Sequence, residues 1–426
     1  MESHQKQVRF TGLLIMLLAL TLAVAGVYAF RSLAIIPGIL GLAFFLAYRP
    51  VFGTWPPFHK HSLMIVLGIL ALGGLSSLWS YDPSVSLERT GKMALAMIPA
   101  LFLVSVAAAL PPAAVQRFLW MIPASIAVLL GFLLVDLASD FSLWRAIKSI
   151  PAEQRIRTSD LNRPVVMVAL FLFPAAFYVW RVVRAPSKRG ALIVFFTGLL
   201  LTVFALSDSE ASVFAFGAGL LALFLFPYRL RVAWYGAAVL FALCVFSAPW
   251  AVQWAFENHA ETVHESAFLG QGGGHGAHRL EIYNFVGKRI LKSPFYGYGI
   301  EGFRSKTFET DGIYYERGRS ESVIHHPHNF ALQAWIEFGL IGAVLAVAFA
   351  CYLLRRIYAL GHGLHQRFMM ASFVAFFAIA AVTFNVWHGW WIGVCFILLV
   401  YLVLLDRVLA ADRPESDQNK AGIKPE

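Results

Sequence analysis

The sequence has little charge and few cysteines. Only 14% of its 426 residues are charged, 59% are hydrophobic, and the mean hydropathy is +0.68. These values exclude an ordinary soluble domain, in which about 25% of residues are charged. Cys244, Cys351 and Cys395 lie in apolar runs and form no CxxC pair, so we expect neither a disulfide framework nor a zinc site.

Nucleotide- and metal-binding signatures are also absent. The Gly-rich stretch 269–278, "LGQGGGHGAH", lacks the strand, lysine and hydroxyl residue of a phosphate-binding loop, and no DxD pair occurs. The sequence therefore predicts no cofactor and no metal site. The net charge of +10 belongs mostly to loops, which indicates contact with membrane lipids and not with nucleic acid.

Long apolar runs dominate the chain. A membrane-spanning helix needs about 20 mostly apolar residues, and continuous runs of this kind exclude a β-barrel, whose strands alternate. We predict an all-α integral membrane protein with about twelve transmembrane helices. The predicted spans are 11–29, 32–48, 62–79, 92–110, 117–137, 164–182, 190–206, 212–228, 232–249, 329–353, 368–386 and 388–405.

These spans divide the chain into four parts. Residues 1–249 carry helices 1–9, residues 250–328 form one long outer segment with short helices, residues 329–405 carry helices 10–12, and residues 406–426 form a polar tail. Lys and Arg gather in alternate short connections, as the positive-inside rule requires if both termini are cytoplasmic. The outer segments are then periplasmic.

Two outer segments carry features of their own. The short segment 136–163 is unusually basic for its predicted side, which indicates that it meets an anion; its cations are Arg145, Lys148, Arg155, Arg157 and Arg163. The segment 278–294, "HRLEIYNFVGKRILKSP", predicts a basic amphipathic helix that ends before Pro294 and lies on the outer leaflet near lipid phosphates.

A polar cluster opens the tenth predicted span. The segment 322–342 reads "SVIHHPHNFALQAWIEFGLIG", and we expect His328 and Asn329 in the first helical turn, where free N–H groups bind phosphate and disfavour a positive charge. His328 is then a neutral imidazole that can act as a general base. Asn329, Gln333 and Glu337 follow as one polar stripe that faces the interior or a water-filled cavity. The alternative is a histidine and a stripe that serve only packing.

Three further stretches carry candidate residues. Arg163 in "LNRPVVMV" and Arg279 in "HRLEIY" suit bidentate recognition of phosphate, with head-group anchoring and a solvated helix face as the alternatives. Ser207, Asp208 and Glu210 in "LSDSEAS" can bind sugar hydroxyls or orient a cation, or serve as a helix cap.

Several of these stretches, in this order, resemble the O-antigen ligase and polymerase superfamily. The strongest are "HRLEIYNFVGKRILKSPFYGYG" and "HPHNFALQAWIEFGLIG", accompanied by "LSSLWSYDPSVSLER", "LNRPVV" and "FNVWHGWWIG" between about 72 and 393. The chain departs from the family pattern in "SDSEAS", where many relatives carry an Arg, and at Tyr283, where Trp is common.

The resemblance implies a metal-independent, inverting glycosyltransferase of the GT-C type. Such an O-antigen ligase transfers O-antigen glycan from undecaprenyl diphosphate to the lipid A–core oligosaccharide at the periplasmic face of the Gram-negative inner membrane. On this reading His328 is the base and Arg163 and Arg279 bind the donor diphosphate. The supporting residues are Asn162, Asn329, Tyr283, Ser207, Asp208 and Glu210.

Three alternatives stay open from the sequence. An O-antigen polymerase uses a lipid-linked acceptor, and a protein O-oligosaccharyltransferase uses a Ser or Thr hydroxyl. A membrane transporter is the alternative from a different class, although the sequence has no inverted repeat of the kind that many transporters share.

Overall fold

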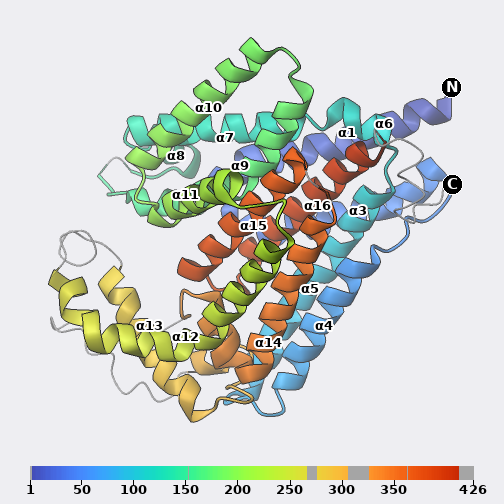
Figure 1. Ribbon diagram of the computed structural model, residues 1–426. Helices are drawn as coiled ribbons and strands as arrows, with labels where there is room; N and C mark the ends of the chain where they lie inside the picture. Colours follow the sequence, from blue (N-terminus) through green and yellow to red (C-terminus); the bar gives the residue numbers. More distant parts are fainter. Residues whose placement is uncertain (1, 152, 266–275, 306–325, 362, 412–426) are drawn as a thin grey trace. The chain divides into compact units, whose positions relative to one another are not determined.

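The computed structural model describes residues 2–151, 153–265, 276–305, 326–361 and 363–411 (Figure 1). These residues form helices and no strand, which confirms the all-α class. Among them nine helices are long and apolar enough to cross a membrane, and three shorter apolar helices accompany them. Each predicted span overlaps one of these helices.

The α-helices of the described residues have the following bounds: α1 (Glu2–Leu20), α2 (Gly26–Tyr28), α3 (Ile36–Phe52), α4 (Lys60–Ser76), α5 (Pro83–Ala109), α6 (Pro112–Phe118), α7 (Met121–Ala138), α8 (Ser142–Lys148), α9 (Asn162–Val182), α10 (Pro186–Leu206), α11 (Glu210–Leu225), α12 (Arg231–Glu265), α13 (Gly276–Lys292), α14 (Phe330–Tyr358), α15 (Leu364–Val382) and α16 (Gly389–Ala411).

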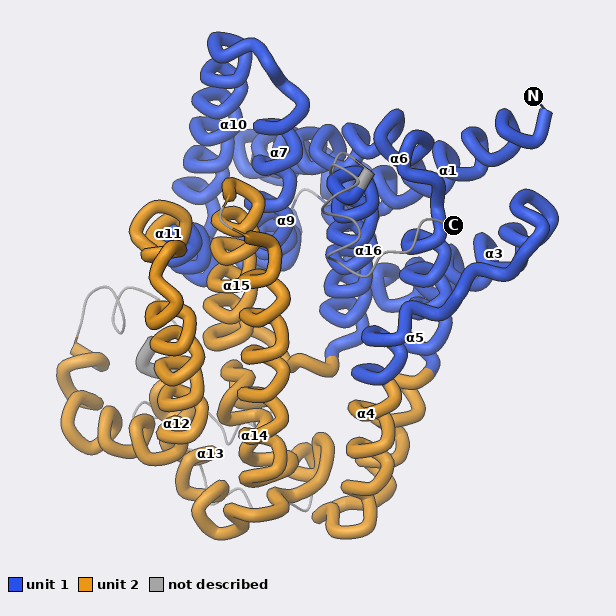
Figure 2. The backbone as a smooth tube through the Cα atoms, turned by 45° about the vertical axis from the view of Figure 1, so that its right-hand side comes forward, with its two compact units in different colours: residues 1–66, 95–219, 388–426 blue, residues 67–94, 220–387 orange. Residues whose placement is uncertain are grey.

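The chain divides into two compact units, which Figure 2 distinguishes by colour. Unit 1 comprises residues 1–66, 95–219 and 388–426, and unit 2 comprises residues 67–94 and 220–387. The segment of unit 2 between α12 and α14 was predicted to begin at residue 250. The helix α12, which contains the predicted span 232–249, continues past Pro249 to Glu265, since a loss of hydropathy marks where a span ends and not where its helix ends.

In unit 1, α1 packs against α3, α6 and α7, and α9 packs against α7, α10 and α16. α9 is buried over most of its circumference, and Phe171 stacks on Tyr401 of α16 with ring centroids 6.3 Å apart. A helix that is apolar all round belongs in the interior of a membrane protein. The first residues of α9 are therefore held by the surrounding helices.

In unit 2, α12, α13 and α14 form one packed group. The apolar face of α13, with Ile282, Val286 and Ile290, is buried against Val245 of α12 and Trp335 of α14. The amphipathic helix predicted over 278–294 is confirmed as α13. Its apolar face, however, covers protein and does not insert into lipid, because neighbouring helices offer it the same burial.

α14 is broken at Gly339, whose φ of 61° and ψ of −143° interrupt the helix. The break frees the carbonyls of Ile336 and Glu337, which accept hydrogen bonds from Tyr298 N (2.8 Å) and Gly299 N (2.9 Å). Both donors belong to the turn 294–299, "PFYGYG", which follows α13. The turn thus supplies the main-chain partners that a broken membrane helix needs.

Glycine is required where this turn meets its neighbours. Gly299 has a φ of +77°, and a Cβ atom added to it would lie 2.4 Å from Ser80 Cβ. Gly297 has a φ of +66°, and its Cβ would lie 2.6 Å from the main-chain carbon of Glu337. Both positions therefore require glycine for two reasons: the backbone is left-handed, and a neighbouring segment lies too close for a Cβ atom.

Candidate functional site

His328 lies immediately before α14 and not in its first turn. Asn329 is the N-cap of the helix, and its Oδ1 accepts hydrogen bonds from Ala331 N (2.9 Å) and Leu332 N (3.0 Å). The prediction that both residues lie in the first turn is wrong, because an Asn at this position caps a helix better than it extends one. The cap also uses two of the N–H groups that the predicted anion site required.

The ring of His328 is held by main chain. Its Nδ1 lies 2.6 Å from the carbonyl oxygen of Thr383, just after α15. A carbonyl oxygen can only accept, so Nδ1 carries the proton and the lone pair of the neutral ring is on Nε2. His328 has a φ of +53°, and its ring lies 3.9 Å from that of His326, centroid to centroid.

Tyr283 and Arg279 connect α13 to this histidine. The Tyr283 hydroxyl donates to the main-chain carbonyl of His328 at 3.3 Å. Burial raises the pKa of Tyr283 to about 12, against a smaller lowering by the positive charge of Arg279. Arg279 lies four residues before Tyr283 on the same helix face. No described residue forms an ion pair or hydrogen bond with its guanidinium, so Arg279 can bind an anion from outside the described chain.

The polar stripe of α14 forms a buried hydrogen-bond network. Gln333 Nε2 donates to Glu337 Oε1 (3.0 Å) and to Asn385 Oδ1 (2.8 Å), and Gln333 Oε1 accepts from Val386 N (3.1 Å). Trp387 Nε1 donates to Glu337 Oε2 at 2.5 Å. Gln333 is 1% exposed and Glu337 and Asn385 are 0% exposed. The stripe therefore faces the protein interior, as predicted, and its polar atoms bond to other residues.

Glu301 brings two cations into the same network. Its Oε1 accepts from Asn385 Nδ2 (2.6 Å), while its Oε2 accepts from Arg89 Nε (2.5 Å) and Arg304 Nη1 (2.9 Å). Two arginines thus face the carboxylate of Glu301. A buried carboxylate surrounded by donors and counter-charges is tolerated where an isolated one is not.

The segment around Trp79, one of the stretches in the family resemblance, fixes the turn after α13. Trp79 Nε1 donates to Tyr296 O (2.8 Å), and Ser80 Oγ donates to Tyr298 O (3.1 Å). Ser86 Oγ donates to Ile300 O at 2.7 Å. The segment around Trp79 therefore has a structural role: it holds the turn 294–299, which lies next to Glu301 of the hydrogen-bond network.

In unit 1, Arg163 lies in the first turn of α9 among aromatic rings and other cations. Its guanidinium carbon is 4.4 Å from the ring centroid of Phe30 and 5.9 Å from that of Trp390. Lys148 Nζ is 6.0 Å from the same Phe30 ring. Burial lowers the pKa of Lys148, and the charge of Arg31 lowers it further, against an opposing effect of Asp160. We call Arg31, Lys148 and Arg163 the cation cluster.

The cation cluster has the character of an anion site. The Arg163 Nε is buried and has no hydrogen-bond partner among the described residues, and the same holds for Asn162 Oδ1. Lys148 and Arg163 lie over one ring, and the charge of Arg31 acts on both; such cations repel each other unless an anion neutralises them. The prediction that the basic segment 136–163 meets an anion is consistent with this arrangement.

The predicted residues after α10 make local contacts in unit 1. Asp208 accepts a hydrogen bond from Thr158, and Ser207 Oγ donates to Phe204 O at 3.4 Å. Glu210 is the first residue of α11. No group of three His, Cys, Asp or Glu suited to a metal ion occurs in the part of the chain that the structure describes.

Of the predicted residues, His328, Asn329, Tyr283 and Arg279 come together in unit 2. Arg163, Asn162, Ser207, Asp208 and Glu210 belong to unit 1. Sequence reasoning did not find the partner of His328, the partners of the polar stripe, or one member of the cation cluster. These residues are Thr383, Asn385, Glu301 and Arg31, whereas Lys148 was expected only as one of the cations of the segment 136–163. Asn385 and Lys148 lie within stretches that the sequence had singled out, whereas no local signal marks Glu301.

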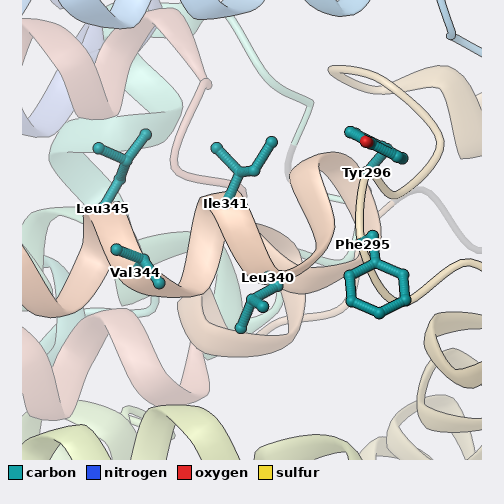
Figure 3. Close-up of a pocket in the computed structure, with 6 residues that line it drawn as sticks. All are labelled: Phe295, Tyr296, Leu340, Ile341, Val344 and Leu345. Atoms are coloured by element: carbon teal, nitrogen blue, oxygen red, sulfur yellow. The ribbon is translucent and has the colours of Figure 1, made fainter.

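An open apolar groove of about 390 Å³ lies on the turn and α14, beside the break at Gly339. Figure 3 shows Phe295 and Tyr296 of the turn beside four aliphatic side chains of α14; the latter are Leu340, Ile341, Val344 and Leu345. Such a lining offers contacts to hydrocarbon and no group for acid–base chemistry. The groove is therefore separate in kind from the polar site around His328.

Comparison with known proteins finds a similarity over part of the chain. The family model described as O-antigen ligase matches residues 192–347, a range that includes Tyr283, Arg279, His328 and the first half of α14. This part of the chain is therefore similar to the O-antigen ligase family. The match ends before the segment 383–387 that contacts His328.

Proteins of three Rickettsia species, each named "Putative polysaccharide ligase", are similar to this chain. Identity is 28% over 224 residues for Rickettsia conorii, covering 51% of this chain and 52% of the relative. It is 29% for Rickettsia bellii, covering 50% and 51%, and 32% for Rickettsia felis, covering 30% and 32%. The chain thus spans about half the length of the first two relatives and 32% of the length of the third. No solved structure matches the chain.

Proposed function

We propose that this protein is an O-antigen ligase. It transfers O-antigen glycan from undecaprenyl diphosphate to the lipid A–core oligosaccharide, as an inverting, metal-independent glycosyltransferase of the GT-C type. The observation that carries the proposal is the Nδ1 contact of His328 with Thr383 O, at 2.6 Å. That contact places the ring proton on Nδ1, so the neutral tautomer carries its basic lone pair on Nε2. His328 lies in the range that matches the O-antigen ligase family model.

The chemistry needs one base and stabilisation of a leaving diphosphate. A hydroxyl of the acceptor sugar attacks the anomeric carbon of the glycan, and its proton passes to His328 Nε2. The bond between that carbon and the phosphate oxygen breaks, and undecaprenyl diphosphate leaves with the electron pair. Arg279 in unit 2 is a proposed ligand of the donor diphosphate, because guanidinium groups bind phosphate in a bidentate manner. The same property makes Arg163 of the cation cluster in unit 1 a proposed ligand in its own right.

The supporting residues fall into two groups. Tyr283 holds the main-chain carbonyl of His328, and Asn329 caps the helix that follows. Asn162, Ser207, Asp208 and Glu210 surround the start of α9 and α11, where we propose that they assist in binding the donor. Arg31 and Lys148 join them as members of the cation cluster.

We place the protein in the inner membrane of a Gram-negative bacterium, with both termini cytoplasmic and the active site periplasmic. About twelve spans and the alternation of basic loops support this topology. Residues 250–328 are then the periplasmic segment between helices 9 and 10, and residues 406–426 the cytoplasmic tail. The partners are the lipid-linked donor, the lipid A–core acceptor and the surrounding membrane lipids.

A reconstituted transfer assay tests the reaction. Purified protein, lipid-diphosphate-linked glycan and lipid A–core acceptor are combined with excess EDTA and no nucleotide. The proposal predicts full transfer. Activity that is lost in EDTA and restored by magnesium or manganese would contradict metal independence and direct attention to Asp208 and Glu210.

Deletion of the gene distinguishes the acceptor. A ligase deletion leaves lipopolysaccharide as bare core while lipid-linked polymer accumulates. Core that carries a single repeat would identify a polymerase instead. Normal lipopolysaccharide with loss of glycan from proteins would identify a protein O-oligosaccharyltransferase.

A further inference from the structure

The geometry assigns a positioning role to Gln333, Glu337 and Asn385: we propose that they fix the segment 383–387 so that the Thr383 carbonyl holds the His328 ring. This inference rests on the proposed role of His328 as the base. It concerns residues that touch neither the ring nor a substrate and that act through the main chain of another segment.

The three side chains bind consecutive residues of one short segment. Gln333 Oε1 accepts from Val386 N, Asn385 Oδ1 accepts from Trp387 N (2.8 Å), and Glu337 Oε2 accepts from the Trp387 indole. The segment links α15 to α16 and has no regular structure over residues 384 and 385. Without side-chain partners its main-chain groups would be unsatisfied inside a membrane protein. The network therefore determines where this segment lies.

Thr383 is fixed from the other side as well. Its hydroxyl donates to Ile379 O on α15 at 2.6 Å, and its φ of −124° and ψ of −100° depart from the helix that precedes it. Its carbonyl is thus turned out of the helix and accepts from His328. Asn385 lies two residues further along the chain, so a shift of Asn385 moves this carbonyl.

Residues of α14 position both the His328 ring and its acceptor, the Thr383 carbonyl. Asn329 caps this helix next to His328, while Gln333 and Glu337 lie one and two turns further along it. A base must be held within about 0.5 Å of its productive place, and a shift of about 1 Å can lower a rate about 100-fold. A complete network of buried amides and carboxyls provides such a constraint, because each member would be costly to leave unpaired.

Exchange of a glutamine for methionine tests the role and has a matched control. Gln333→Met removes the network's bonds to Val386 and Asn385 at nearly constant volume. Gln366→Met is the control, because Gln366 is equally buried in unit 2 but, among the described residues, bonds to the carbonyls of Ile357 and Tyr358 at the end of α14. We expect Gln333→Met to lower kcat at least about tenfold with donor KM within about twofold, and Gln366→Met to leave kcat unchanged. Wild-type kcat in Gln333→Met would overturn the proposal.

A double-mutant cycle separates positioning from general damage. If Gln333 acts through His328, then Gln333→Met lowers the residual rate of a His328→Asn protein by less than about twofold. A further loss of tenfold in that background would show an independent role and overturn the proposal. If Gln333→Met does not fold, Trp387→Phe, which removes only the indole donor to Glu337, is carried through the same cycle.

The same cycle distinguishes this inference from the proposed function. A His328→Asn protein with wild-type activity would refute the base itself. An inactive His328→Asn protein together with a fully active Gln333→Met protein would refute only the positioning role.

Discussion

The Nδ1 atom of His328 lies 2.6 Å from the main-chain carbonyl oxygen of Thr383, 55 residues further along the chain. A side chain in place of that carbonyl could be lost by a single substitution, whereas a main-chain acceptor depends on the position of its whole segment. The tautomer of the proposed base is therefore set by the fold of unit 2.

Tyr283→Phe is expected to lower the transfer rate about fivefold, because it removes the hydrogen bond to the carbonyl of His328, worth about 1 kcal/mol. The pKa of Tyr283 is raised to about 12, so this bond is intact below the ordinary pKa of 10.0 and is lost only as the pH rises towards 12. The ratio of wild-type to variant rates should thus stay constant between about pH 6 and 9. Tyr296→Phe is the control, since Tyr296 offers its carbonyl and not its hydroxyl to Trp79; equal rates in both variants would contradict the assignment.

Arg279→Lys is expected to raise the apparent KM for the lipid-diphosphate donor about tenfold. A lysine keeps the charge but cannot form two parallel hydrogen bonds to a phosphate. Arg289→Lys on the same helix serves as the control, because the Arg289 guanidinium lies 5.4 Å from the Phe285 ring centroid and has no proposed ligand. Steady-state kinetics with varied donor check the result, and identical KM values for the two variants would return Arg279 to a structural role.

Arg163→Lys is expected to weaken donor binding by a similar factor. Its matched control is Arg189→Lys, because both guanidinium carbons lie 4.4 Å from an aromatic centroid, of Phe30 and Trp180 respectively. Any effect of a cation–π contact alone would then appear in both. Equilibrium binding of labelled donor to the two proteins decides the matter; equal affinities would make the cation cluster a lipid-head-group anchor.

Gly299→Ala is expected to destabilise unit 2 far more than Gly361→Ala. The two glycines have nearly the same φ, +77° and +79°, but an added Cβ meets Ser80 at 2.4 Å in the first and nothing within 4 Å in the second. The conformational cost of about 1–2 kcal/mol is common to both, so the difference measures the close approach of the turn. Thermal unfolding in detergent, followed by tryptophan fluorescence, should show a lower midpoint for Gly299→Ala; equal midpoints would mean that the turn can move.

The helices of this protein could be predicted from sequence because a membrane span requires a continuous apolar run. α13 was also predictable, since Ile282, Val286 and Ile290 recur at helical spacing and Pro294 follows. What those residues face was not, because lipid and a neighbouring helix bury an apolar face equally well. The same limit applies to where α12 ends.

The candidate site divides in the same way. His328 and the polar stripe of α14 could be recognised locally, since polar residues at membrane depth are costly. Their partners could not, because Asn385 is 52 positions from Gln333 and 84 from Glu301. The cap formed by Asn329 displaced His328 from the helix, a difference of two residues that spacing alone does not resolve.

The most direct test of the account is the single-turnover transfer rate of His328→Asn protein reconstituted in lipid vesicles with bound donor. Asn is chosen because it tolerates the φ of +53° at this position, so the fold is preserved. Loss of a general base predicts a rate about 100- to 10,000-fold below wild type, with donor binding retained. A wild-type rate in this variant would contradict the assignment of His328 as the base.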